Sequence, residues 1–467
     1  MTGTPMAAAA PIRRRHVAMI ALGGMLGAGF FVGSGSVVAA AGPASLLSVL
    51  ATALLLMAVM DMLGDMVIAD PCDGSFVAHV RHGLGAWGGF VAGWLYLFFW
   101  VVVIGSEAIA GAIMLHDVLP LPVGLLAPLL VLALAMLNGM SVRIFAELEF
   151  VLCAVKIASI VLFVILAVLY CLRAHPSPPG IAANFGSWAR FAPHGYGVVA
   201  GALPTVMFTM MGAEMVLVAA AESGDGKFFA RRLTRSVGLR MGGFYLLSAV
   251  PILAILPWRE MAAGRSPFLQ AMVVIGVPGA TTIMTAIVFV AILSCLNSAL
   301  YVTSRLLAEL ADHGDAPAIL SRRVRRTIPV RAIAACAAAG CAVAALSLIS
   351  PDRVFAFLLS ASGSVILFVY VMVVMAHWTM WKTGNRVLAA AGGMGVRCAP
   401  FSHAVVIVAL LGALAAMLGD DLQRPTLFAS LGTLAACLGC YGIRRYRQAR
   451  RPGHPPSPFP TAQGDRS

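Results

Sequence analysis

Apolar windows of about 20 residues recur from one end of the chain to the other. A helix of this length crosses the roughly 30 Å hydrocarbon core of a bilayer. The chain is 60% hydrophobic and 11% charged, whereas soluble domains carry about 25% charged residues. The alternating segments of about ten residues that build a membrane β-barrel do not occur. The sequence therefore predicts an all-α, polytopic membrane protein.

The apolar windows define about twelve transmembrane spans. The predicted spans are 17–40, 43–67, 86–115, 121–141, 148–172, 195–220, 236–256, 278–309, 330–350, 354–381, 401–419 and 425–446. The first span is too long for the apolar region of a signal peptide, so we expect no secretion or cleavage.

Basic residues are distributed unequally between the two sides of this bundle. With the N-terminus in the cytoplasm, the internal segments include 13–15, 227–240, 322–331 and 444–451. The Lys and Arg residues left outside are Arg173, Arg190, Arg259, Arg265, Arg353 and Arg424. This is the positive-inside pattern, which predicts that both termini are cytoplasmic. The net charge of +13 then follows from topology and attraction to anionic lipid, and no nucleic-acid partner is expected.

Motifs of membrane enzymes are missing from the sequence. It contains no HExxH, no GxSxG and no cluster of His and Cys at metal-ligand spacing. No Walker lysine follows the glycines near the N-terminus, and no predicted strand precedes them. We therefore expect no catalytic residues, no cofactor and no metal, which leaves a channel, a receptor or a secondary transporter.

The stretch Leu22–Gly35, LGGMLGAGFFVGSG, carries six glycines inside the first span. Glycine weakens a helix, and a broken helix is tolerated in a membrane only where it lines a cavity or is buried in protein. The freed N–H groups of the following half-helix can bind an anion. A second interruption, FTMMGAE at Phe208–Glu214, lies in the sixth span, as expected for inverted repeats. The alternative is that the glycines, which are spaced four apart, only let helices pack closely.

Several longer motifs resemble the amino acid permeases of the amino acid–polyamine–organocation superfamily. They include HVAMIALGGMLGAGFFVGSG, AELEF, GAEMVLVAAAES and SCLNSALY, and the last two are most similar to 4-aminobutyrate (GABA) permeases. The resemblance implies a leucine-transporter-like fold, with a 5+5 inverted repeat and two extra helices, in the bacterial inner membrane. Residues 17–381 would form the transporter core and 382–446 two accessory helices, between cytoplasmic tails at 1–16 and 447–467.

The resemblance also implies a substrate site between the two interruptions. The substrate carboxylate would bind the backbone of Met25, Leu26, Gly27, Ala28 and Gly29, and Phe208 would form an aromatic lid. Freed carbonyls around Gly212 would meet the substrate amino group. Glu107 would line the site, with a structural hydrogen-bond anchor as the alternative. Met210 replaces a residue that is commonly aromatic in the family.

Coupling residues are expected around Lys156 in the fifth span. In similar proteins such a lysine occupies the space of a sodium ion, with Ser294 and Asn297 nearby, and its burial favours release of its proton. Glu214 is expected to gate the site or cap a helix. Glu149 is expected to be a structural anchor. Asp61 and Asp65 stand where relatives usually have arginine and glutamate, which leaves the identity of the substrate open.

The sequence thus predicts a proton-coupled importer of 4-aminobutyrate or a related small amino acid, working by alternating access. The amino acid substrate, protons and the lipid bilayer are its expected partners, and the oligomeric state stays open. Two alternatives remain: an antiporter of the same fold that exchanges an amino acid for an amine, and a sensor that binds without transport.

Overall fold

The computed structural model describes residues 14–69, 75–116, 118–174, 177–221, 227–261, 266–323, 328–348, 351–384, 388, 393–421 and 423–449. Most of the predicted tails, 1–13 and 450–467, lie outside these residues, as does Arg265.

Twelve membrane-crossing segments make up the described bundle. Ten candidate spans are long and apolar enough to cross a membrane, and the first of them, Gly29–Ala69, holds α3 together with the second half of the first segment. The first and the sixth segments are interrupted. The segments are α1 (Arg14–Gly23) with η1 (Gly29–Gly33) and α2 (Ser34–Ala41), α3 (Ser45–Ala69), α5 (Ala86–His116), α6 (Val123–Met140), α7 (Val142–Arg173), α10 (Gly197–Thr209) with α11 (Met215–Ala221), α12 (Lys227–Ile255), α14 (Ala280–Asp312), α15 (Val330–Ala345), α16 (Pro351–Lys382), α19 (Phe401–Ala416) and α20 (Arg424–Ala449). The predicted number of spans is therefore confirmed.

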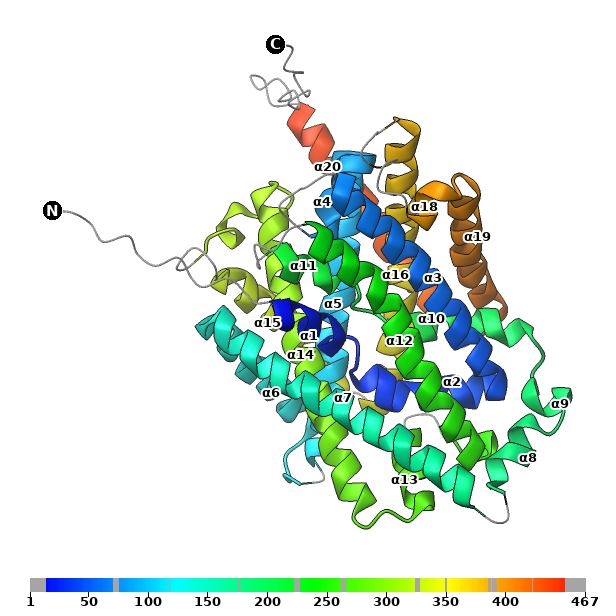
Figure 1. Cartoon of the computed structure of the whole chain (residues 1–467). Helices are drawn as coiled ribbons and strands as arrows, with labels where there is room; N and C mark the ends of the chain where they lie inside the picture. Colours follow the sequence, from blue (N-terminus) through cyan, green and yellow to red (C-terminus); the bar gives the residue numbers. More distant parts are fainter. Residues whose placement is uncertain are drawn as a thin grey trace.

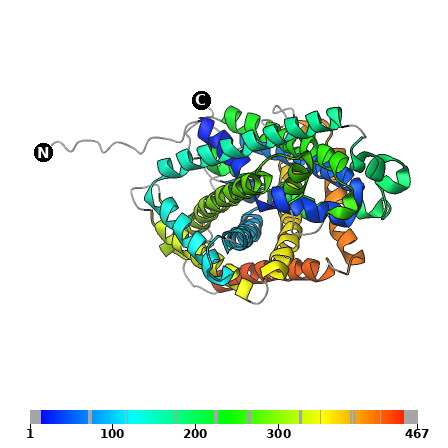
Figure 2. The same cartoon turned by 90° about the horizontal axis from the view of Figure 1, so that it is seen from below.

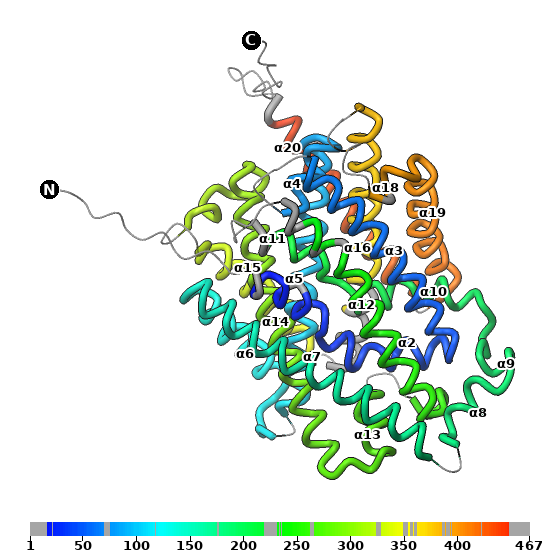
Figure 3. The backbone as a smooth tube through the Cα atoms, viewed as in Figure 1, coloured from blue at the N-terminus to red at the C-terminus, as the bar shows by residue number. Residues whose placement is uncertain are grey.

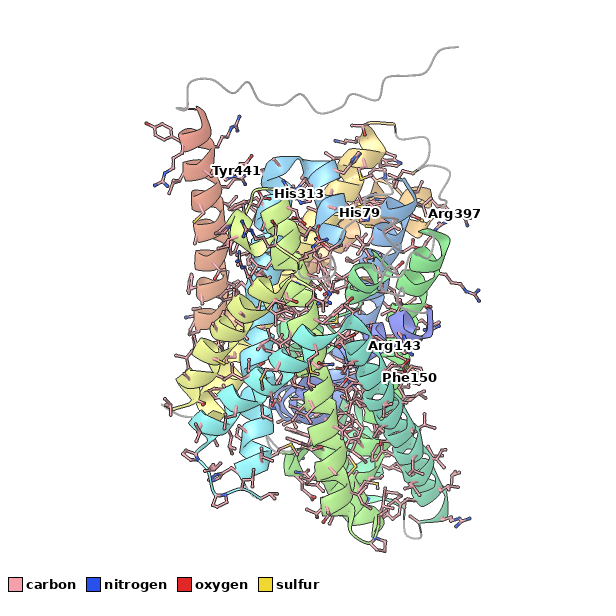
Figure 4. The ribbon with its side chains drawn as sticks, turned by 90° about the vertical axis from the view of Figure 1, so that its left-hand side faces the viewer. His79, Arg143, Phe150, His313, Arg397 and Tyr441 are labelled. Carbon is pink, nitrogen blue, oxygen red and sulfur yellow. The ribbon has the colours of Figure 1, made fainter. Side chains whose placement is uncertain are left out.

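Short helices cover the two ends of the bundle. They are α4 (Phe76–Leu84), α8 (Pro179–Phe185), α9 (Trp188–Phe191), α13 (Pro267–Ile275) and α18 (Met394–Arg397). Figure 1 shows α4, α18 and the end of α20 at one end, called here the upper end, and α8, α9 and α13 at the opposite, lower end. Figure 4 places His79, His313, Arg397 and Tyr441 near the upper end. Hydropathy does not predict these helices, because they are shorter than a membrane span.

Equivalent helices of the two halves pack against each other. α3 contacts α12, α5 contacts α14, α1 contacts α11, and α2 contacts α10. A pseudo-two-fold axis in the membrane plane produces such pairs, so the bundle has the predicted leucine-transporter-like arrangement. Seen from below, α19 and α20 run along the edge of the bundle (Figure 2). Lipid is the natural solvent for the apolar side chains that the outer helices expose, including Leu162 and Val408.

Two helices begin six or more residues before their predicted spans. α7 starts at Val142, where the Ser141 hydroxyl accepts a hydrogen bond from the Arg143 N–H at 3.2 Å, and α12 starts at Lys227. The segment 227–240, expected as a basic loop, is therefore helical. Lys156 consequently lies about 14 residues, or roughly 21 Å, from the start of its helix, rather than the eight residues expected.

Candidate functional site

The first interruption separates α1 from η1 and α2, and the chain visibly changes direction there (Figure 3). The Gly27 carbonyl accepts the first hydrogen bonds of the new helix, from the N–H groups of Phe30 at 3.1 Å and Phe31 at 3.3 Å. Ala28, the residue that caps η1, lies directly before this helix. Its N–H is therefore one of the orphan donors that a helix N-terminus presents.

Close packing also requires glycine at this interruption. A Cβ at Gly27 would lie 2.8 Å from the Cβ of Cys295 and would overlap Glu107 Oε1. A Cβ at Gly23 would overlap the carboxylate of Glu149. The two interpretations of the glycines are thus compatible, because the same residues break the helix and let its backbone approach α5, α7 and α14.

The second interruption separates α10 from α11 and meets the first. Gly212 adopts φ +109°, a conformation that L side chains rarely adopt. A Cβ there would lie 3.0 Å from Met25 Cγ and 3.4 Å from the carbonyl carbon of Gly24. The predicted pairing of the two interruptions is therefore a direct contact in the structure.

A cavity of about 270 Å³ lies between the interruptions, α5 and α14. The residues that line it are Gly24, Met25, Gly27, Gly29, Phe99, Trp100, Val103, Glu107, Phe208, Thr209, Met211 and Cys295.

Five of the expected substrate residues line this cavity: Met25, Gly27, Gly29, Phe208 and Glu107. The other expected residues, Leu26, Ala28, Met210 and Gly212, are in the interruptions but are not part of the lining.

Two residues of the lining on α5, Phe99 and Val103, were missed although their spacing from the predicted Glu107 could have revealed them. Phe99, Val103 and Glu107 follow one face of α5 at intervals of four. Trp100 also lines the cavity and lies on the same side of the helix. Cys295 has no comparable signal, because it lies between Ser294 and Asn297, which face α7.

Glu107 binds the backbone of the first interruption. Its side chain is buried, and both carboxylate oxygens accept the N–H of Ala28 at 3.1 Å. A buried carboxylate needs such donors, and the N-terminus of a helix supplies them together with a favourable dipole. The observed contact therefore combines the two alternatives considered for Glu107, since the side chain lines the cavity and is also anchored by a hydrogen bond.

Glu214 lies at the end of the second interruption and joins two other helices. Its carboxylate accepts the hydroxyl of Tyr96 on α5 at 2.8 Å and that of Tyr370 on α16 at 3.2 Å. All three side chains are buried. α5 descends from the upper end, and Tyr96 precedes the cavity residues on it, so this cluster lies between the cavity and the upper end.

Lys156 on α7 is fully buried and reaches the end of α1. Its ammonium donates to the Gly23 carbonyl at 2.5 Å. Gly23 is the last residue of α1, so its carbonyl is freed by the interruption and carries the negative end of the helix dipole. The structure thus brings the Lys156 ammonium to the first interruption.

Ser294 and Asn297 contact Glu149 instead of Lys156. Ser294 donates to Glu149 Oε1 at 2.5 Å, and the Asn297 amide donates to Oε2 at 3.1 Å. Asn138 on α6 in turn donates to the Asn297 side-chain oxygen at 2.8 Å. Glu149 is seven residues before Lys156 and is fully buried, so the two lie on one face of α7 as a buried acid and base.

Aromatic side chains fill the region between the cavity and the lower end. Phe30 packs edge-on against Tyr245 at 4.6 Å between ring centroids and lies 5.1 Å from Phe268 of α13. The Tyr245 hydroxyl donates to the Thr209 carbonyl at the end of α10. Beyond this contact lies a second, mainly apolar cavity of about 490 Å³, which Thr209 also borders.

Asp61 and Asp65 lie outside the cavity. Asp65 forms an ion pair with Arg231 of α12 at 3.0 Å, and Asp61 accepts the N–H of Gly395 at 3.4 Å. These departures from the family pattern therefore connect α3 to its neighbours and do not shape the cavity.

Comparison with known proteins shows the family to which this chain is similar. Residues 16–451 match the family described as "Amino acid permease". The chain is 38% identical to the probable GABA permease of Pseudomonas aeruginosa, covering 93% of this chain and 92% of that protein. It is 36% identical to the gamma-aminobutyric acid permease of Bacillus subtilis, covering 89% of each protein. It is also 36% identical to the gamma-aminobutyric acid permease of Escherichia coli, covering 79% of this chain and 80% of that one.

Solved structures share the fold. The crystal structure of a mutant manganese transporter of Eremococcus coleocola superposes with a TM-score of 0.58, covers 94% of this chain and 95% of that one, and is 14% identical in sequence.

Proposed function

The chain belongs to the amino acid permease family, and from this premise we propose that it imports 4-aminobutyrate or a closely related small amino acid, by proton-coupled alternating access. The observation that carries the proposal is the small cavity at which both helix interruptions meet. The three relatives described above are named as permeases of 4-aminobutyrate, which supports this substrate class.

Alternating access would use the two closures around the cavity. The Glu214 cluster with Tyr96 and Tyr370 closes the route to the upper end. The contact between Phe30, Tyr245 and Phe268 closes the route to the lower end, where the second cavity offers a path. Opening one closure while the other stays shut exposes the cavity to one side of the membrane at a time.

Lys156 offers a means of coupling to protons. Its ammonium holds the end of α1 against α7 through the Gly23 carbonyl. A neutral amine would donate a weaker hydrogen bond to this carbonyl, because hydrogen bonds from charged donors are roughly twice as strong as those from neutral donors. Loss of the proton would therefore loosen α1 and shift the equilibrium between the two facing states.

The orientation follows from charge. Arg81, Arg231, Arg323 and Arg444 belong to helix ends or loops at the upper end, where α4 and the end of α20 lie. The positive-inside pattern would place this end in the cytoplasm, in the inner membrane of a bacterium. The lower end would then receive the substrate.

A competition assay tests the proposal. Radiolabelled 4-aminobutyrate is bound to the purified protein, and lysine, phenylalanine, asparagine and alanine compete with it. We expect 4-aminobutyrate to bind and the bulky or basic amino acids to compete poorly, because the cavity is small. Absence of binding by every amino acid of this panel would refute the proposal. Uptake into vesicles without internal substrate separates import from the antiport alternative, in which internal substrate is required.

A further inference from the structure

Glu107 occupies the position where a substrate carboxylate would bind. The Ala28 N–H, an orphan donor at the start of η1, is taken up by both oxygens of the Glu107 carboxylate. Glu107 also lines the cavity, together with Gly27 and Gly29 on either side of Ala28. The protein's own carboxylate therefore satisfies the backbone of the first interruption.

A substrate carboxylate in this cavity would meet the Glu107 carboxylate at close range. Two unit charges about 4 Å apart in a protein interior repel strongly enough to change an equilibrium by roughly a thousandfold. The cavity of about 270 Å³ leaves little room to separate them. One of the two carboxylates must therefore lose its charge when the substrate binds.

Three titratable groups on neighbouring helices interact electrostatically with Glu107: Lys156 of α7, Cys295 of α14 and Tyr245 of α12. The Lys156 ammonium is engaged with the Gly23 carbonyl, and the Tyr245 hydroxyl with the Thr209 carbonyl. Cys295 lies against Glu107 and the Gly24 carbonyl. None of these groups supplies a second cation that would neutralise two carboxylates at once.

We propose that Glu107 holds the place of the substrate carboxylate in the empty site, and that the substrate displaces it as Glu107 takes up one proton. This inference rests on the proposed function. The proton comes from the side to which the cavity is open and converts the carboxylate to the neutral acid, which leaves the Ala28 N–H. The proton is released when the substrate departs and the Glu107 carboxylate returns to the Ala28 N–H. Glu107 would thus make substrate binding and proton binding one event.

Binding measured against pH tests this directly. The dissociation constant of radiolabelled 4-aminobutyrate is determined for the purified full-length protein between pH 5 and 9. If binding takes up one proton, the wild-type constant rises tenfold per pH unit on the alkaline side. Glu107→Gln, which is always neutral, should bind with the same constant at every pH and lose this slope. Glu107→Asp, one methylene shorter, should compete less well for Ala28 and bind more tightly than wild type at high pH.

Glu309→Gln is the matched control. Glu309 is another carboxylate that accepts a backbone N–H, that of Ser75 at 3.0 Å, but it lies near the end of α14 away from the cavity. This variant should keep the wild-type slope.

Four outcomes would overturn the inference. They are a wild-type constant that does not change with pH, a Glu107→Gln variant that keeps the slope, a folded Glu107→Gln variant that no longer binds, and a Glu107→Asp variant that is weaker than wild type at every pH. The third would make Glu107 a direct ligand of the substrate. If wild type binds 4-aminobutyrate at no pH, the proposed function itself fails, which distinguishes the two.

Discussion

Replacing Tyr370 with phenylalanine removes one of the two hydroxyls that hold the Glu214 carboxylate, while the ring that packs between α16 and the second interruption stays. The lost bond spans 3.2 Å and the remaining one, from Tyr96, spans 2.8 Å. A hydrogen bond to a charged group contributes about 1.5–3 kcal/mol. If the closed state loses about 2 kcal/mol of stability, the ratio of open to closed protein rises roughly 30-fold.

Cys295 provides a native reporter of this opening. Its thiol is buried and lines the cavity, so a maleimide reaches it only when one closure opens. In a variant that keeps Cys295 as its single cysteine, Tyr370→Phe should speed alkylation about 30-fold, and Tyr96→Phe should do so at least as much because its bond is shorter. Tyr441→Phe, on α20 at the edge of the bundle, is the control and should leave the rate unchanged. Alkylation of Tyr370→Phe and Tyr96→Phe at the wild-type rate would show that the cluster does not close the upper route.

Three further predictions address the glycines, the lysine and the orientation. Gly27→Leu should abolish substrate binding in a protein that still folds in the membrane. Gly432→Leu, at a position where a Cβ meets open space, should bind substrate normally. Equal substrate affinity in the two variants would show that Gly27 serves only helix packing. Lys156→Met should lose accumulation against a gradient and keep exchange of substrate for substrate, whereas the exposed Lys382→Met should keep both; full accumulation by Lys156→Met would move coupling to other residues. A cysteine at Arg259 should react with an impermeant thiol reagent added to intact cells, and one at Arg323 should not; the opposite pattern would invert the proposed topology.

The fold could be predicted because a membrane restricts the chain so strongly. Apolar length alone located the twelve segments, and the glycines of Leu22–Gly35 and Phe208–Glu214 located the two interruptions. Helix starts were less accurate, because α7 and α12 extend beyond the apolar windows into polar sequence. Short capped helices such as α4 and α13 carry no hydropathy signal of this kind.

The candidate site was predicted only in part, because contacts depend on how helices face each other. Glu107, Lys156 and Glu214 stood out as charges in apolar spans, and all three lie at the interruptions. Their partners did not stand out. Tyr96 and Tyr370 are ordinary aromatic residues in apolar sequence, and Cys295 is a small residue among others. Ser294 and Asn297 contact Glu149, although we expected them near Lys156. Which of the two residues they contact depends on the rotation of α14 against α7, which sequence spacing does not determine.

Uptake driven by an imposed pH gradient tests the central claim most directly. Proteoliposomes with an interior two pH units more alkaline than the medium, without sodium and with the membrane potential clamped at zero, are given radiolabelled 4-aminobutyrate. With at least one coupled proton per substrate, each pH unit supports at least a tenfold concentration ratio, so the account predicts accumulation that approaches or exceeds about 100-fold and collapses when a protonophore is added. Uptake that requires sodium or internal substrate, or that never exceeds the external concentration, would contradict it.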